Sequence, residues 1–182
     1  MSGSSEQSPK VERTVAVDAT VAAPPKELSA AEVAAAAEAA QKRRNDYNRL
    51  ARTARLNNLL LEKVDFRILP DALGIKESLL TRNLSPTTKV MSYGAEDGTC
   101  VANILWEVVF KYKNKNVVKC TASYIVSYDG AKDYSQETIA LFLENVGKVA
   151  TYAYFRALYA HLDWSANLGS QPLPVLQLQP KV

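Results

Sequence analysis

The stretch that decides the fold reads VANILWEVVFKY from Val101 to Tyr112 and VVKCTASYIVSY from Val117 to Tyr128, with the polar residues Lys113–Asn116 between the two runs. Apolar and polar side chains alternate along each run with a period of two, as in a β-strand that buries one face. Two such runs joined by a short polar segment that contains asparagine predict an antiparallel hairpin.

Side-chain character indicates the register of this hairpin. The even-numbered positions of both strands are apolar and include Trp106 and Tyr124, whereas the odd-numbered positions carry the polar residues. A one-residue slip would mix the two faces, so Trp106 and Tyr124 are expected on the same side. This condition requires a loop with an odd number of residues, and we predict Asn114–Lys115–Asn116 with an asparagine in the left-handed conformation.

The odd-numbered face also carries apolar residues. Val101, Leu105, Val109 and Ile125 lie on it. Apolar patches on a protein surface mark contacts with other molecules. We therefore expect this face to be half covered, by another subunit or by a client.

Two further strands are predicted upstream of the hairpin. Residues Asn57–Leu69 form the first, in which Leu59–Leu61 interrupt the alternation, and Thr87–Tyr93 form a shorter one that ends at Gly94. The segment Ile75–Asn83 fits neither a helix nor a strand pattern. With the hairpin, these segments predict a four-stranded antiparallel sheet.

Helical spacing follows the hairpin. It begins at Asp133 or Ser135, is interrupted at Gly147 and continues to about Leu162. Apolar residues recur along it as on one face of a helix. The predicted fold class is therefore α+β: a four-stranded antiparallel sheet with two C-terminal helices packed on one face, preceded by an N-terminal helix.

The chain divides into three segments. Residues 1–28 contain no aromatic residue, so they cannot bury enough surface to offset their ordering entropy and are predicted to be a disordered tail. Residues 29–55 form an Ala-rich, basic helical extension that starts with the capping box Ser29–Glu32. Residues 56–182 form one domain.

Composition bounds the compartment and the partners. The net charge of +3 is small and excludes neither nucleic acid nor protein partners. No run of eighteen apolar residues and no secretory signal is visible, so we expect no membrane span. Two isolated cysteines fit a reducing compartment, and a cytoplasmic location is predicted.

Nothing in the sequence indicates catalysis. Cys100, Cys120 and His161 are the only soft metal ligands, and a zinc site needs three or four that converge. The two cysteines lie near opposite ends of the predicted hairpin, too far apart to share a metal or a disulfide. With no glycine-rich phosphate loop and no paired-His motif, we predict no enzyme activity, no metal and no cofactor.

A basic run lies in the helical extension. It consists of Lys42, Arg43, Arg44, Arg49, Arg52 and Arg55. The last three would share one helix face, which could bind a phosphate backbone. A solvated helix face is the preferred interpretation, because no aromatic residue is interleaved for base stacking.

Aromatic residues surround the last predicted helix. Tyr152, Tyr154, Phe155, Tyr159 and Trp164 go right round it. A helix that is apolar on several sides needs more than one partner. Either this helix lies at an oligomer interface or it lines a groove. If it lines a groove, the aromatic residues not used by the core contact a client, and the predicted client-binding residues are Tyr154, Tyr159, Trp164, Leu105 and Val109.

This order of elements resembles the SecB family of bacterial export chaperones. The resemblance rests on the late hairpin, on the segment Asn145–Arg156 (NVGKVATYAYFR) and on Leu173–Leu176 (LPVL). Tyr154–Phe155–Arg156 matches the family's helix start, whereas Ala153 stands where the family has proline. The likeness covers roughly Leu56 to Gln179.

The resemblance implies a dimer of dimers that holds unfolded or precursor polypeptides in long apolar grooves, with no catalysis. Acidic side chains on the SecB sheet dock the translocation motor, whereas this chain mixes Glu107 with Lys111 and Lys119, which argues against motor docking. We predict a cytoplasmic holdase for non-native or export-destined chains. The alternatives are a dedicated module for one partner, such as an antitoxin, and a nucleic-acid binder acting through Arg43–Arg55.

Overall fold

A computed structural model describes residues 29–72, 74–94 and 96–176. The predicted tail, residues 1–28, lies outside the described residues. The helices are α1 (Ala30–Thr53), α2 (Gln136–Phe142) and α3 (Lys148–Ser165), and the strands are β1 (Arg55–Ile68), β2 (Thr81–Tyr93), β3 (Cys100–Tyr112) and β4 (Lys115–Asp129). The strands form one antiparallel sheet in the order β1-β4-β3-β2, which confirms the predicted fold class.

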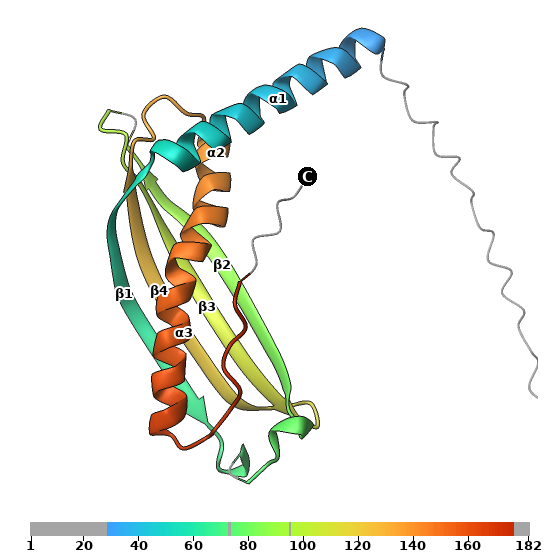
Figure 1. Ribbon diagram of the computed structural model, residues 1–182, viewed down its shortest axis with the longest axis vertical. Coiled ribbons are helices and arrows are strands. Elements are labelled where there is room, and N and C mark those ends of the chain that lie inside the picture. Colours follow the sequence, from blue (N-terminus) through green and yellow to red (C-terminus); the bar gives the residue numbers. More distant parts are fainter. Residues whose placement is uncertain (1–28, 73, 95, 177–182) are drawn as a thin grey trace, which may run out of the picture.

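The molecule has two layers (Figure 1). Helices α2 and α3 run along one face of the sheet, and α1 crosses one end of the sheet and extends beyond it. After α3 the chain turns back and runs beside this helix on its β2 side. No helix within the described ranges is long and apolar enough to cross a membrane.

The predicted register of the hairpin is confirmed, and the predicted loop is wrong. Ile104 pairs with Tyr124 and Trp106 with Ala122, so even-numbered residues of one strand lie opposite even-numbered residues of the other. The loop, however, is the two-residue turn Lys113–Asn114, with φ values of 45° and 65°. Such a turn matches the twist of the strands. An extra residue on β4, between the partners of Phe110 and Lys111, then restores the even register.

Strand β2 begins at Thr81, six residues earlier than the sequence indicated. Pro86 lies inside it, opposite Trp106. Proline lacks the donor that a central strand needs, but β2 is an edge strand, where one side of the backbone makes no ladder bonds. The ambiguous segment Ile75–Asn83 holds a short 3-10 turn, Glu77–Leu79, and the start of this strand.

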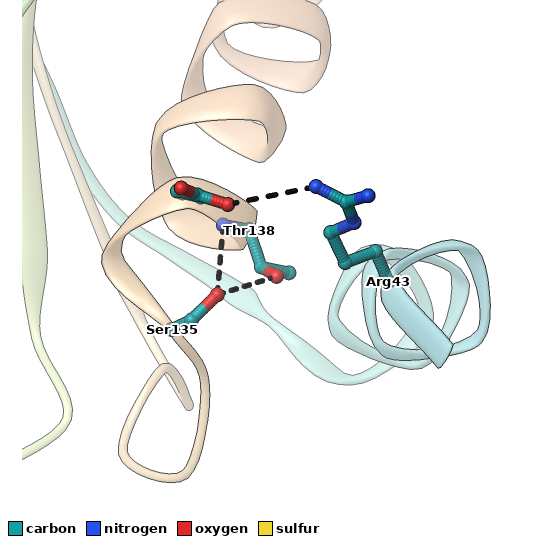
Figure 2. Close-up of polar contacts among 4 residues, drawn as sticks. Arg43, Ser135 and Thr138 are labelled. Carbon is teal, nitrogen blue, oxygen red and sulfur yellow. Dashed lines mark hydrogen bonds and ion pairs between the residues drawn. The ribbon is translucent and has the colours of Figure 1, made fainter. Parts of the chain in front are cut away.

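The two C-terminal helices are joined without a break by a π-helical turn, Leu143–Gly147. A Cβ atom on Gly147 would lie 2.7 Å from Cδ1 of Ile104, so glycine is what lets the helix approach the sheet here. Of the two predicted start residues, Ser135 is the cap: its hydroxyl accepts from the backbone N–H of Thr138 at 3.2 Å (Figure 2).

The core lies between α3 and the even-numbered face of the hairpin. Trp106 packs against Phe155 and Tyr152, with ring centroids 5.7 and 4.8 Å away. Its indole N–H donates to the Thr151 hydroxyl at 2.9 Å, so its one polar atom is satisfied within the core. Cys100 and Cys120 are buried and free, and burial raises the pKa of each thiol to about 11.

Helix α1 is held to the body by its C-terminal half. The predicted capping box is present, with Ser29 and Glu32 bonded reciprocally. Leu50 is fully buried, and the Arg43 guanidinium lies 4.0 Å from the Glu137 carboxylate of α2 (Figure 2). The residues before Gln41 are exposed, so this part of the helix has no tertiary packing.

Candidate functional site

An extended C-terminal segment, residues 168–176, lies along the β2 side of α3. Its backbone is held by side chains from α3 and β2. The Asp163 carboxylate accepts from the Ser170 N–H at 3.1 Å, and the Arg82 guanidinium donates to the Gln171 carbonyl at 3.1 Å. The Tyr152 hydroxyl donates to the Pro174 carbonyl at 2.5 Å.

One apolar side chain anchors this segment. Leu173 is only 2% exposed, whereas Val175 and Leu176 beyond it are exposed. Prolines on both sides of Leu173 favour the extended backbone and remove two donors that would otherwise need partners. The molecule thus binds an extended, apolar stretch of its own chain through tyrosine and arginine donors, and we call this side of α3 the covered flank.

The opposite side of α3 faces β1, and no segment in the described part of the chain covers it (Figure 1). Leu61 and Val64 pair with Tyr124 and Ala122, which are buried under the helices, so they point to the same face of the sheet. Yet Leu61 is 49% exposed and Val64 is 37% exposed. Leu56, opposite Tyr128, is exposed as well.

Tyr154 borders the same surface from the helix. At 100° per residue it lies about 160° round α3 from Tyr152, whose hydroxyl reaches the C-terminal segment. It therefore points away from that segment, toward the β1 side seen in Figure 1, and it is 56% exposed. We call the surface formed by Leu56, Leu61, Val64 and Tyr154 the uncovered flank.

Two tyrosine hydroxyl groups lie beneath this flank without a partner. The Oη atoms of Tyr124 and Tyr128 are buried and make no hydrogen bond to any described residue. Burial raises the pKa of each phenol to about 12, so both stay neutral donors at physiological pH. A buried hydroxyl without a partner costs free energy, which a ligand that supplies an acceptor would recover.

The other face of the sheet, away from the helices, carries a mixed surface. Glu62 accepts from the Asn103 amide at 2.6 Å and from the Ser123 hydroxyl at 2.8 Å. Lys119 and Glu107 form an ion pair at 2.5 Å. Apolar side chains surround these groups, as the sequence indicated, and among them Leu105 is exposed.

The predicted client-binding residues are divided between these surfaces. Tyr154 and Trp164 are exposed on α3, with Trp164 79% exposed near the helix end, and Leu105 lies on the far side of the sheet. Tyr159 and Val109 are buried, and the Tyr159 hydroxyl lies 3.1 Å from that of Ser170. In this conformation these two residues have little surface left for a ligand.

Sequence reasoning missed the β1 residues of the uncovered flank. Leu59–Leu61 broke the apolar–polar alternation because Leu60, opposite Ile125, places an apolar side chain on the other face of the sheet. The strand also carries register irregularities after Leu56 and after Leu61. An extra residue shifts the side-chain pattern from one face to the other, so a simple period of two fails here. The signal was the leucine run itself, which no ordinary half-buried strand needs.

The fold is similar to that of a SecB-like chaperone. Rv1957 of Mycobacterium tuberculosis, solved in complex with a ChAD peptide from the Rv1956 HigA1 antitoxin, aligns with a TM-score of 0.59 and 20% sequence identity. The alignment covers 74% of this chain and 99% of that chain. The SecB-like resemblance is therefore confirmed at the level of the fold.

Another similar structure adds nothing to this assignment. It is a protein of unknown function from Streptococcus agalactiae, with 10% identity over 69% of this chain and 97% of that chain, and its TM-score is 0.36. No protein-family model and no curated protein matches the chain.

Proposed function

We propose that this protein is a non-catalytic chaperone that binds extended, non-native polypeptides along the uncovered flank of α3. The observation that carries the proposal is the contrast between the two sides of this helix. On one side the chain holds an extended apolar segment of its own. On the other side a similar combination of apolar side chains and tyrosine hydroxyls has no occupant among the described residues.

The chemistry of this flank suits an unfolded chain. Leu56, Leu61 and Val64 offer apolar contact along one strand, and Tyr154 offers a large side chain whose ordering costs little entropy. Tyr124 and Tyr128 lie four residues apart on the same face of β4, about 13 Å along the strand, and could donate to client carbonyl groups after a small opening. Trp164 extends the contact surface toward the end of α3.

A dedicated partner is the second candidate. The similar chaperone from Mycobacterium tuberculosis was solved with a peptide from one antitoxin, which favours recognition of a particular sequence over general capture. The two functions use the same surface and differ in selectivity. Affinities for a panel of unfolded chains separate them, because a general holdase binds most of the panel within about tenfold and a dedicated module binds one member.

The test uses two matched double variants and a fluorescently labelled, permanently unfolded client. Leu61→Thr with Val64→Thr makes the uncovered flank polar, and threonine is β-branched and therefore favourable in a strand. Leu60→Thr with Leu105→Thr makes the same kind of change on the opposite face of the sheet. We expect the first pair to weaken client binding at least tenfold and the second to leave it nearly unchanged.

A different pattern of weakening between the two double variants would place the client-binding site elsewhere or refute the proposal. If only the second pair weakens binding, the client lies on the sheet face that carries Leu105. If neither pair does, or if the parent protein neither binds unfolded chains nor suppresses their aggregation, the chaperone proposal is wrong. Circular dichroism and a melting curve for each variant exclude loss of fold as the cause.

Assembly follows from the same exposed surface. Leu60 and Leu105 are exposed on one face of the sheet, and Leu61 and Val64 on the other, and exposed apolar side chains that cluster mark contacts with other molecules. We propose a cytoplasmic homo-oligomer, a dimer of dimers as in SecB. Light scattering should give a mass well above the 20.0 kDa of one chain, and a clean monomer at micromolar concentration would refute this.

A further inference from the structure

The outward face of α1 carries positive charge and no apolar residue. Leu50 marks the inward direction because it is fully buried. At 100° per residue, the positions more than about 100° away from it between Gln41 and Thr53 include three arginines and three amides. These exposed residues are Gln41, Arg44, Asn45, Asn48, Arg49 and Arg52.

No carboxylate neutralises this face. Asp46 lies about 40° from Leu50 and is half-buried, and Glu38 marks the N-terminal limit of the face. Arg43 points to the other side, where it meets Glu137. Arg44, Arg49 and Arg52 form no ion pair with any residue in the described ranges. Their positive charge is therefore available to a ligand.

The side chains also form a shallow hollow. Asn45, Asn48, Arg49, Arg52 and Thr53 line it. The residues that line it include two arginines and two asparagines, whose guanidinium and amide groups can donate hydrogen bonds to phosphate oxygens. From Arg44 to Arg52 the helix rises about 12 Å, a length over which one DNA strand presents three or four phosphates.

Other polyanions fit this face less well. A helix that lies in a membrane surface needs an apolar side with large residues, and the exposed part of α1 is mostly alanine with Val33 as its one larger aliphatic residue. An acidic protein partner would need a buried aromatic or aliphatic anchor, and the outward face offers none. A duplex needs only phosphate contacts and hydrogen bonds to base edges.

The shape of α1 agrees with this choice. The C-terminal half of α1 packs on the body through Leu50 and Arg43, and the side that faces away from these contacts is exposed from Gln41 to Arg52. A helix with its side chains is about 10–12 Å wide, close to the width of the DNA major groove. Arginine and asparagine are the residues that read guanine and adenine there.

We propose that the outward face of α1 binds duplex DNA, with Arg44, Arg49 and Arg52 on the phosphate backbone and Asn45 and Asn48 beside them. This binding is separate from the proposed polypeptide site, because α1 packs on α2 and the client surface lies between β1 and α3. The protein thereby holds a polypeptide and a nucleic acid at the same time.

The experiment measures anisotropy of a labelled duplex of about 20 base pairs as salt is raised, with the full chain. The test variant is Arg44→Gln, Arg49→Gln and Arg52→Gln, and the control is Lys111→Gln, Lys113→Gln and Lys115→Gln. Both remove three positive charges, but the control acts at the hairpin end of the molecule. Glutamine keeps helix propensity near that of arginine, so α1 stays folded.

We expect the α1 variant to bind at least tenfold more weakly at low salt. Its slope of log K against log salt should fall by about 2 to 3, since each lost phosphate contact removes about 0.9. The control should keep the parent's slope and affinity. Client binding should be the same in all three proteins, so this result is independent of the chaperone proposal.

Three outcomes overturn the proposal. The first is equal weakening by the two triple variants, which would indicate attraction by net charge alone. The second is no measurable binding by the parent at low salt. The third is equal or tighter binding of an RNA duplex of the same length, because the major groove of A-form RNA is too narrow to admit a helix.

Discussion

On the β2 side of α3, the Tyr152 hydroxyl donates to the Pro174 carbonyl and Leu173 is buried, whereas on the β1 side the Tyr124 hydroxyl has no hydrogen-bond partner within the described ranges and Leu61 is half exposed. Both sides combine apolar side chains with tyrosine hydroxyls, and the covered flank has Arg82 and Asp163 in addition. Among the described residues, an extended segment of the chain lies over the β2 side only (Figure 1). On the covered flank an extended chain buries apolar surface and accepts the available hydrogen bonds. We place a client on the uncovered flank because that surface can bind an extended chain in the same way.

The largest expected effect is the loss of unfolding free energy when a buried aromatic residue of the covered flank is removed, compared with an exposed aromatic residue on the same helix. Tyr159→Ala removes a buried ring that stacks on Phe110 with centroids 6.1 Å apart, and should cost about 3–5 kcal/mol in the free energy of unfolding. Trp164→Ala should cost less than about 0.5 kcal/mol because this side chain is mostly exposed. Urea denaturation of both variants measures these values.

Client affinity gives the complementary readout for the tryptophan. Trp164→Ala should weaken binding of an unfolded client by about 1–3 kcal/mol, since large aromatic side chains dominate such contacts. A variant that unfolds readily would show that Trp164 packs in the native protein. A variant that binds as tightly as the parent would remove Trp164 from the client surface and leave Tyr154 as the aromatic contact on α3.

Sequence reasoning succeeded where one periodic pattern determines the structure. The apolar even positions around Trp106 and Tyr124 required one register, and the structure has that register. The Ser29–Glu32 capping box was visible as a local signal and is present, whereas the predicted interruption at Gly147 is a π-helical turn through which the helix continues. These features depend on residues near one another in the chain or on strict alternation, which sequence displays directly.

The features that were missed depend on tertiary context. The predicted strand started at Thr87, after Pro86, but β2 is an edge strand and runs through this proline. The two-residue turn Lys113–Asn114 was not predicted because it would pair even with odd positions. The extra residue on β4, between the partners of Phe110 and Lys111, restores the pairing of even with even positions. The uncovered flank was invisible because exposure of Leu61 depends on where α3 lies, and no local pattern encodes that position.

The next prediction tests the anchor of the covered flank. Leu173→Ala should lower the free energy of unfolding by about 2–3 kcal/mol, because it leaves a cavity beneath the C-terminal segment. Val175→Ala, two residues further along the same segment, removes an exposed side chain and should change it by less than about 0.5 kcal/mol. Equal effects of the two variants would mean that the segment does not pack through Leu173.

The smallest expected effect is the change in the free energy of unfolding when a tyrosine hydroxyl is removed, and its sign should differ between the two flanks. Tyr124→Phe removes a buried hydroxyl that has no hydrogen-bond partner among the described residues, so the free energy of unfolding should rise by about 1 kcal/mol. Tyr152→Phe removes a hydroxyl that donates to the Pro174 carbonyl, so the same quantity should fall by about 1 kcal/mol. Both substitutions keep the ring and therefore the packing, which isolates the effect of the hydroxyl.

Client binding adds a second test, since Tyr124→Phe should weaken client binding if that hydroxyl donates to a client carbonyl. A loss of stability in Tyr124→Phe comparable to that in Tyr152→Phe would show that the Tyr124 hydroxyl is already satisfied, and the hydrogen-bonding part of the uncovered flank would have to be given up while its apolar part remained.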